Sequence, residues 1–106
     1  MRFHSKKVLR YLKNSKNKLL ATMRTWNYKM GQRVYFKNIH GRVLGYGTII
    51  NILSIDRAGE VVEYSGFNDV EEWLEEARRL HGRVPKSIYV IRIEKVRSND
   101  IQNEVH

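Results

Sequence analysis

The chain has 106 residues, of which 42% are hydrophobic and 29% charged, and its formal net charge is +9 at pH 7. This length suits one domain with one core, and the absence of cysteine excludes disulfides and thiolate metal sites. No apolar run approaches the roughly 18 residues of a membrane span, and charges interrupt the first apolar stretch, so we expect a cytoplasmic protein with no membrane partner.

The first predicted element is a short amphipathic helix that begins after Ser5, a residue type that caps helix N-termini. At about 100° per residue, three apolar side chains, Val8, Leu9 and Leu12, share one face of this helix. The opposite face is wholly basic and holds Lys6, Lys7, Arg10 and Lys13. We therefore expect the helix to pack on one side and to present positive charge on the other.

A polar, positive loop over 14–18 leads to residues 19–26, whose alternation predicts a strand. The two faces of this strand differ in kind. The face that we expect in the core holds Leu19, Ala21 and Met23. The face that we expect to line a cleft holds Thr22, Arg24 and Trp26.

Residues 33–37 and 43–55 predict two further strands, and the second of these contains Gly45 and Gly47. Glycines inside a strand indicate a bulge or a bend, as a strongly curved sheet requires. A turn then leads to residues 61–64, which predict one more short strand.

The clearest predicted helix begins at Asn68, which forms a capping-box pattern with Glu71 three residues later. Gly82 ends this helix, and residues 87–96 predict the last strand. The apolar stripe of the helix, which we expect to pack in the core, consists of Val70, Trp73, Leu74, Ala77 and Leu80. Residues 98–106 are polar and predict a disordered tail, so the expected domain spans 1–97.

This order of elements predicts an α+β fold that is mainly β, with one N-terminal helix and one helix before the last strand. Short turns join most of the strands, which disfavours a parallel sheet. Short strands with glycine bends favour a small, strongly bent sheet or barrel.

The positive charge is concentrated in the first half of the chain. Residues 1–55 hold twelve Lys and Arg and no acid, whereas residues 56–106 hold eight basic residues and eleven acids, a net charge of −3. Protein surfaces usually intersperse both signs, so an acid-free half indicates a field for a polyanion. A generically basic protein, or a module for an acidic protein partner, is the alternative.

Phosphate binding is the chemistry that this pattern favours, because Lys and Arg neutralise phosphates and aromatic rings stack on unpaired bases. Trp26 and Tyr28 lie among the cations, although core packing is the alternative for both. The candidate nucleic-acid-binding residues are Lys6, Lys7, Arg10, Lys13, Lys16, Lys18, Thr22, Arg24, Trp26, Tyr28, Lys29, Arg33, Lys37 and Ser65.

Other chemistries have little support in the sequence. Four histidines, His4, His40, His81 and His106, are far apart and fit no metal-ligand spacing. The acids of the second helix are typical of a solvated face, and no phosphate-cradling glycine motif is present. We expect no metal and no cofactor.

Three stretches together resemble the ASCH family of the PUA-like superfamily: YLKNSKNKLLATMRTWNYKMGQRVYF, then EYSGFNDVEEWLEEARRLHG, then IYVIRIEKV. The resemblance covers nearly the whole chain apart from the tail. It implies a small PUA-like β-barrel with flanking helices and a cleft, in a class of domains that commonly binds RNA. Some bacterial members of similar length are amidohydrolases of acetylated cytidine that use a Lys and a Glu, with a Thr nearby.

The family residues map unevenly onto this chain. Thr22 and Arg24 match the Thr-x-Arg of the family strand, but the family Lys falls on Leu19 and the family Glu on Ser65. Since a one-residue shift turns a strand side chain to the other face, the neighbouring Lys18 does not simply replace it. The missing acid–base pair argues against catalysis. A small gap near Asn17 would restore the lysine, so a hydrolase or ribonuclease that uses Lys18, Thr22 and Glu63 stays the alternative.

The sequence therefore predicts a monomeric nucleic-acid-binding domain, with RNA preferred and single-stranded DNA as the other candidate. We expect the nucleic-acid backbone to follow the basic helix and strands. A base or strand end would enter the cleft beside Thr22, Arg24, Trp26 and Ser65.

Overall fold

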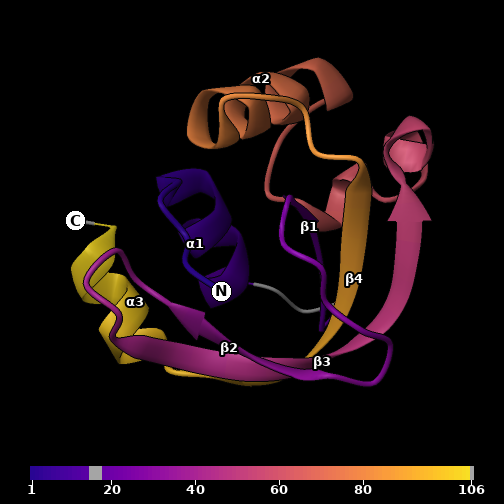
Figure 1. Cartoon of the computed structure of the whole chain (residues 1–106). Coiled ribbons are helices and arrows are strands. Elements are labelled where there is room, and N and C mark those ends of the chain that lie inside the picture. The colour runs from indigo at the N-terminus through magenta and orange to yellow at the C-terminus, as the bar shows by residue number, and fades with distance from the viewer. Residues whose placement is uncertain (15–17, 106) are drawn as a thin grey trace.

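The computed structural model describes residues 1–14 and 18–105. The predicted candidate Lys16 lies outside these residues. The elements are, in chain order, α1 (Lys6–Asn14), β1 (Leu19–Arg24), β2 (Arg33–Lys37), β3 (Val43–Ser54), the 3-10 helices η1 (Ile55–Glu60) and η2 (Val62–Tyr64), α2 (Val70–His81), β4 (Ser87–Val96) and α3 (Ser98–Glu104) (Figure 1). None of the helices described is long and apolar enough to cross a membrane.

The four strands form one antiparallel sheet in the order β1-β4-β3-β2, which confirms the α+β class. The predicted barrel is wrong, because β1 and β2 are the two edges of this sheet and do not pair with each other. The sheet is bent, and α1 lies within its concave side, so helices occupy the space that barrel closure would need (Figure 1).

Two glycines of β3 allow the bend, as the sequence predicts. The β3–β4 register shifts between Tyr46 and Gly47, where the strand bulges. A Cβ atom at Gly47 would lie 2.4 Å from the carbonyl oxygen of Arg92, and one at Gly45 would lie 2.2 Å from that of Lys95. Only glycine permits this approach of the two backbones.

The pair formed by β1 and the first half of β4 is buried on both faces. On one face Leu20 joins a core with α1, β2 and α3, and on the other Ala21 and Met23 pack with Trp73 of α2. The expected division of β1 into a core face and a cleft face is therefore wrong, because helices cover both sides. Leu19, predicted in the core, is only half-buried.

Two local expectations in the middle of the chain differ from the structure. Residues 62–64 form the 3-10 turn η2 and not a strand. The N-cap of α2 is Asp69 and not Asn68, and its carboxylate accepts a hydrogen bond of 2.8 Å from the backbone N–H of Glu72. Both residue types suit an N-cap, so the choice between them depends on backbone geometry. Gly82 ends the helix in the left-handed conformation, as predicted.

The predicted tail is also wrong, because residues 98–104 form α3. Ile101 is fully buried in the core with α1 and β3, and Val105, four residues later, packs beside it. Arg42 bonds Asp100 at 2.7 Å and ties the first turn of α3 to the start of β3. An i, i+4 apolar pair is a weak indication of a helix when the surrounding residues are polar, so the sequence pattern did not predict α3.

Replacing Ile101 by Ala should lower the free energy of unfolding by about 2–5 kcal/mol, because it leaves a cavity at a fully buried position. Urea denaturation measures the loss. The matched control is Asn99→Ala, an exposed position of the same helix, which should cost little. Equal stability of the two variants would show that α3 does not dock.

Candidate functional site

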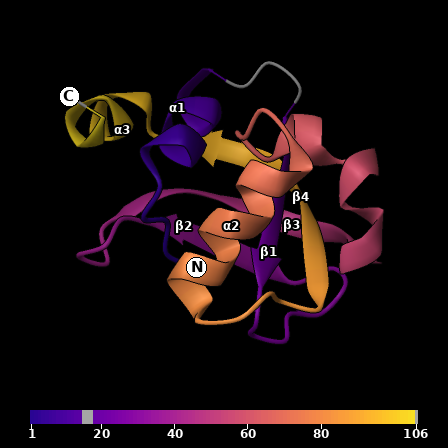
Figure 2. The same cartoon turned by 90° about the horizontal axis from the view of Figure 1, so that it is seen from above.

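A cavity of about 190 Å³ lies at the free edge of β1. Its walls come from four parts of the chain: the N-terminal segment that leads into α1, the strand β1, the loop before α2, and the inner face of α2, which crosses over β1 (Figure 2). The floor includes Phe3, Met23 and Trp73, and the polar groups include Thr22 and Arg24. Thr22, Arg24 and Ser65 of the predicted cleft thus share one site.

Arg24 is the most constrained polar group of this cavity. Its Nε donates to the hydroxyl of Thr22 at 3.1 Å, and its Nη1 donates to the backbone carbonyl of Arg2 at 2.7 Å. Its guanidinium carbon lies 4.6 Å from the centroid of the Phe3 ring. The side chain is therefore held at three points, and its Nη2 donates to no acceptor in the described part of the chain.

The charge of Arg24 has no acidic partner among the described residues. Burial lowers its pKa to about 10, which still leaves the guanidinium charged at neutral pH. Of the cavity-lining residues, Glu76 alone carries a carboxylate, and it is bonded to Arg79 on the same helix. A buried charge is normally paired, so a cation without a partner in a cavity indicates a site for an anion.

Two histidines also line the same cavity. His4 and His81 line it from the N-terminal segment and from the last turn of α2. The pKa of His81 is lowered from its usual 6.5, chiefly by burial and then by the charge of Arg24, while a hydrogen bond with the Met23 backbone opposes the shift. His81 is consequently neutral at pH 7 in the free protein.

Ser65 shapes the cavity wall. Its hydroxyl donates to the carbonyl of Val62 at 2.6 Å and accepts from the backbone N–H of Phe67 at 3.0 Å. Gly66 follows with a φ of 90°, and a Cβ there would come within 3.1 Å of the Lys7 carbonyl oxygen. The glycine thus lets this loop pack against α1, and Ser65 holds the loop in place.

A second hollow, of about 260 Å³, lies beside the cavity and shares Arg24 with it. It is formed by the connection that follows β1 and the connection between α2 and β4. We call it the basic hollow, and its lining residues are Arg24, Thr25, Asn27, Arg83, Val84, Pro85, Lys86 and Ser87.

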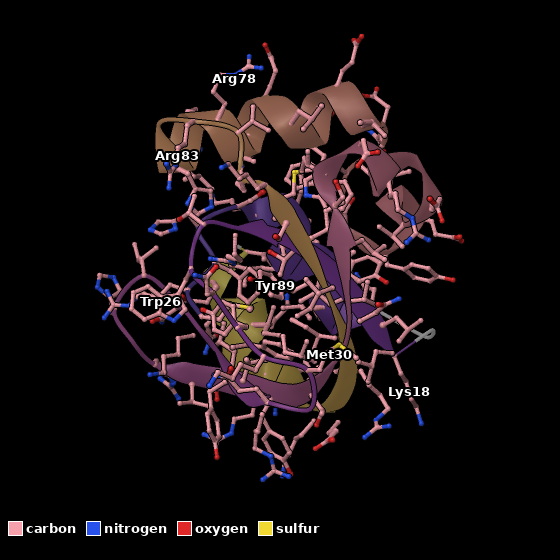
Figure 3. The ribbon with its side chains drawn as sticks, turned by 45° about the vertical axis from the view of Figure 1, so that its right-hand side comes forward. Lys18, Trp26, Met30, Arg78, Arg83 and Tyr89 are labelled. Atoms are coloured by element: carbon pink, nitrogen blue, oxygen red, sulfur yellow. The ribbon has the colours of Figure 1, made fainter. Side chains whose placement is uncertain are left out.

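Two residues of the hydrolase alternative lie outside both sites. Lys18 immediately precedes β1 and Arg24 ends it, so they are separated by six strand residues, or roughly 20 Å at about 3.3 Å per residue. Figure 3 shows Lys18 on the opposite side of the molecule from Trp26 and Arg83. Glu63 is exposed on η2 and lines neither site. Lys18, Thr22 and Glu63 therefore do not converge.

The two predicted aromatic contacts have different surroundings. Tyr28 packs edge-on against Tyr89, with ring centroids 5.2 Å apart, and is partly buried against the core. Trp26 is 71% exposed and lines neither the cavity nor the basic hollow, so its predicted place in the cleft is wrong. Its backbone carbonyl accepts a hydrogen bond from the Tyr89 hydroxyl at 2.9 Å, and this bond holds the turn in place.

The remaining predicted cations in the described part of the chain line neither site. Lys6 and Arg10 are exposed on α1, as expected, while Lys7 bonds Glu72 and links α1 to α2. Arg33 lies 3.4 Å from Glu94 and over the ring of Tyr46 on β3. The others in this group are Lys13, Lys29 and Lys37, of which Lys29 is exposed and the other two are half-buried.

Five basic residues of the two sites were absent from the predicted set: Arg2, His4, His81, Arg83 and Lys86. The two histidines are 77 positions apart in the sequence, and the N-terminal segment and α2 bring them to one cavity only in the folded state. Arg83 and Lys86 belong to the half of the chain that is acidic overall. Their one local signal is that both flank Pro85 in a short connection.

No family model matches the sequence. A protein of Sulfolobus islandicus rod-shaped virus 1, named uncharacterized protein 105, is 29% identical in an alignment of 85 residues that covers 76% of this chain and 77% of the viral protein.

Two solved structures are similar to the whole arrangement. The crystal structure of ASCH from Zymomonas mobilis superposes with a TM-score of 0.52 and 8% identity over 91% of this chain, which spans 66% of that protein's length. A DUF984 protein from Enterococcus faecalis V583 gives a TM-score of 0.50 and 9% identity over 94% of this chain and 74% of its own. The likeness confirms the predicted resemblance at the level of architecture: the chain has an ASCH-like fold.

Proposed function

We propose that this protein binds nucleic acid, and single-stranded RNA in particular, by taking one nucleotide into the cavity at β1. The observation that carries the proposal is Arg24, a fixed cation in the cavity with no acidic partner among the described residues. A guanidinium held in one geometry is suited to a phosphate or to the edge of a base.

The size and lining of the cavity support a single nucleotide. At about 190 Å³ it is smaller than the pockets that hold drug-sized ligands, and its apolar lining includes Phe3 and Trp73. RNA is commonly recognised through unpaired bases that leave the stack and enter such sites. The exposed cations of α1 supply the sequence-independent attraction for the backbone.

RNA binding should weaken about tenfold or more when Arg24 is replaced by Gln, because the anion loses its charged partner in a partly desolvated site. Fluorescence anisotropy with a labelled single-stranded RNA of 12 nucleotides, over a salt series from 50 mM, measures the affinity. Arg57→Gln is the matched control, since it removes one positive charge far from both sites and should have little effect. Absence of binding by the wild type at 50 mM salt, or affinity independent of salt, would contradict the proposal.

RNA binding should also raise the pKa of His81, because a bound anion offsets the positive potential of Arg24 that helps to lower it. Binding then takes up a proton, so affinity should increase as the pH falls from about 8 to about 6. In the free protein the lowered pKa has the opposite consequence: stability declines below pH 6.5, since the unfolded chain binds the proton more readily.

NMR titration of the His81 ring with and without RNA measures this shift, and His40, which lines neither site, is the internal control. The pH dependence of affinity should diminish in a His81→Gln variant. A ring pKa that RNA leaves unchanged would place the bound anion elsewhere.

A nucleoside-modifying hydrolase is the second candidate, and one observation favours it. His81, which is neutral at pH 7, lines the same cavity as Thr22 and Glu76, so a general base is available there. Incubation with acetylated cytidine and with labelled RNA should give no turnover if the protein only binds. Turnover that His81→Gln or Glu76→Gln abolishes, and Lys18→Ala preserves, would favour the enzyme.

A further inference from the structure

We infer that the RNA strand continues from the cavity into the basic hollow, where Arg83 and Lys86 bind the adjacent phosphate and Trp26 stacks on the following base. This inference rests on the proposed function and adds the path of the strand to it. It makes the ligand a phosphodiester-linked strand and not a free nucleoside.

The lining of the basic hollow suits a phosphate. Three cations, Arg24, Arg83 and Lys86, come together there, and no carboxylate is among the described residues that line it. Neither Arg83 nor Lys86 has an ion pair within the described part of the chain. The other polar groups, Thr25, Asn27 and Ser87, are side chains that donate hydrogen bonds to phosphate oxygens in nucleic-acid complexes.

The hollow is built on a fixed backbone. Pro85 is fully buried between the two cations, and the Lys86 carbonyl accepts a hydrogen bond of 3.0 Å from the backbone N–H of Ile55. Ser87 begins β4 and is the register partner of Arg24 at the end of β1. The two connections that form the hollow therefore leave the sheet at the same end, and their positions are set by strand pairing.

The cavity and the hollow are continuous through shared and adjacent residues. Arg24 lines both sites. On the α2 side, His81 lines the cavity, and Arg83, two residues later and past the turn at Gly82, lines the hollow. A nucleotide held at Arg24 thus has its neighbouring phosphate within the field of Arg83 and Lys86.

Trp26 lies next to this path with its ring in solvent. It sits between Thr25 and Asn27, which both line the hollow, and it is on the same side of Figure 3 as Arg83. Bonds from the Tyr89 hydroxyl to the Trp26 carbonyl, and from the Tyr28 N–H to that hydroxyl, fix the turn. A tryptophan that is 71% exposed on a fixed turn offers a base-stacking surface at little entropic cost.

The test uses the same 12-nucleotide single-stranded RNA and a salt series with the Arg83→Gln/Lys86→Gln double variant. We expect affinity to fall about tenfold or more and the slope of log affinity against log salt to fall by about 0.7, since each neutralised phosphate of a single strand contributes about 0.7. The control is Arg57→Gln/Lys95→Gln, which removes the same charge outside both sites. Trp26→Ala should weaken binding about fivefold or more without changing the salt slope.

The outcomes separate this inference from the proposed function. If the wild type binds RNA but the Arg83/Lys86 variant matches the control in affinity and slope, the path through the hollow is wrong and the cavity proposal stands. If the wild type binds no RNA, both fail. Urea denaturation confirms that each variant is folded.

NMR of the wild type gives a second, mutation-free measurement. The four ribonucleoside monophosphates should shift the backbone amide signals of Lys86 and Ser87 as well as those of the cavity, whereas the four nucleosides should shift only the latter. Equal shifts at Lys86 and Ser87 with both sets would overturn the inference.

Discussion

The burial of the β1–β4 pair on both faces is the constraint on which the rest of this structure depends. Leu20 and Ile91 face the core beneath α1, while Met23 and Val90 face the core beneath α2. Because both faces must be covered, the two helices lie on opposite sides of the same pair of strands. β1 is also an edge strand, so the helices meet beyond its free edge and leave a cavity there. The cavity therefore results from the placement of the two helices that cover the β1–β4 pair.

Arg24 places a positive charge in that cavity, where an apolar side chain would lower the stability of the fold less. Arg24 is desolvated enough that its pKa falls to about 10, yet no acid among the described residues compensates it. Backbone and hydroxyl acceptors from Arg2 and Thr22, with the ring of Phe3, stabilise it only in part. Partial burial of a charge without an acidic partner costs stability, and such sites are enriched in functional positions.

Local periodicity predicted most of the elements, although the N-cap of α2 is Asp69 and not Asn68. The apolar stripe over Val8 and Leu12 and the core position of Trp73 follow from helical spacing and are confirmed. α3 was missed because a polar segment with a single buried isoleucine has little periodicity, and its stability comes from docking. The prediction of a core face and a cleft face for β1 was wrong for a related reason. Alternating residues indicate a single buried face only when the other face of the strand is solvated.

The sequence by itself determined the acid-free half of the chain, the basic face of α1, the glycine bend of β3 and the place of Thr22 and Arg24 on one strand. These are properties of composition and short-range spacing, which need no knowledge of neighbours. Only the tertiary structure decided that His81, Arg83 and Lys86 join Arg24 and that Lys18 does not. Those relations depend on strand order and helix placement, because residues far apart in sequence meet only where packing of the two cores brings their elements together.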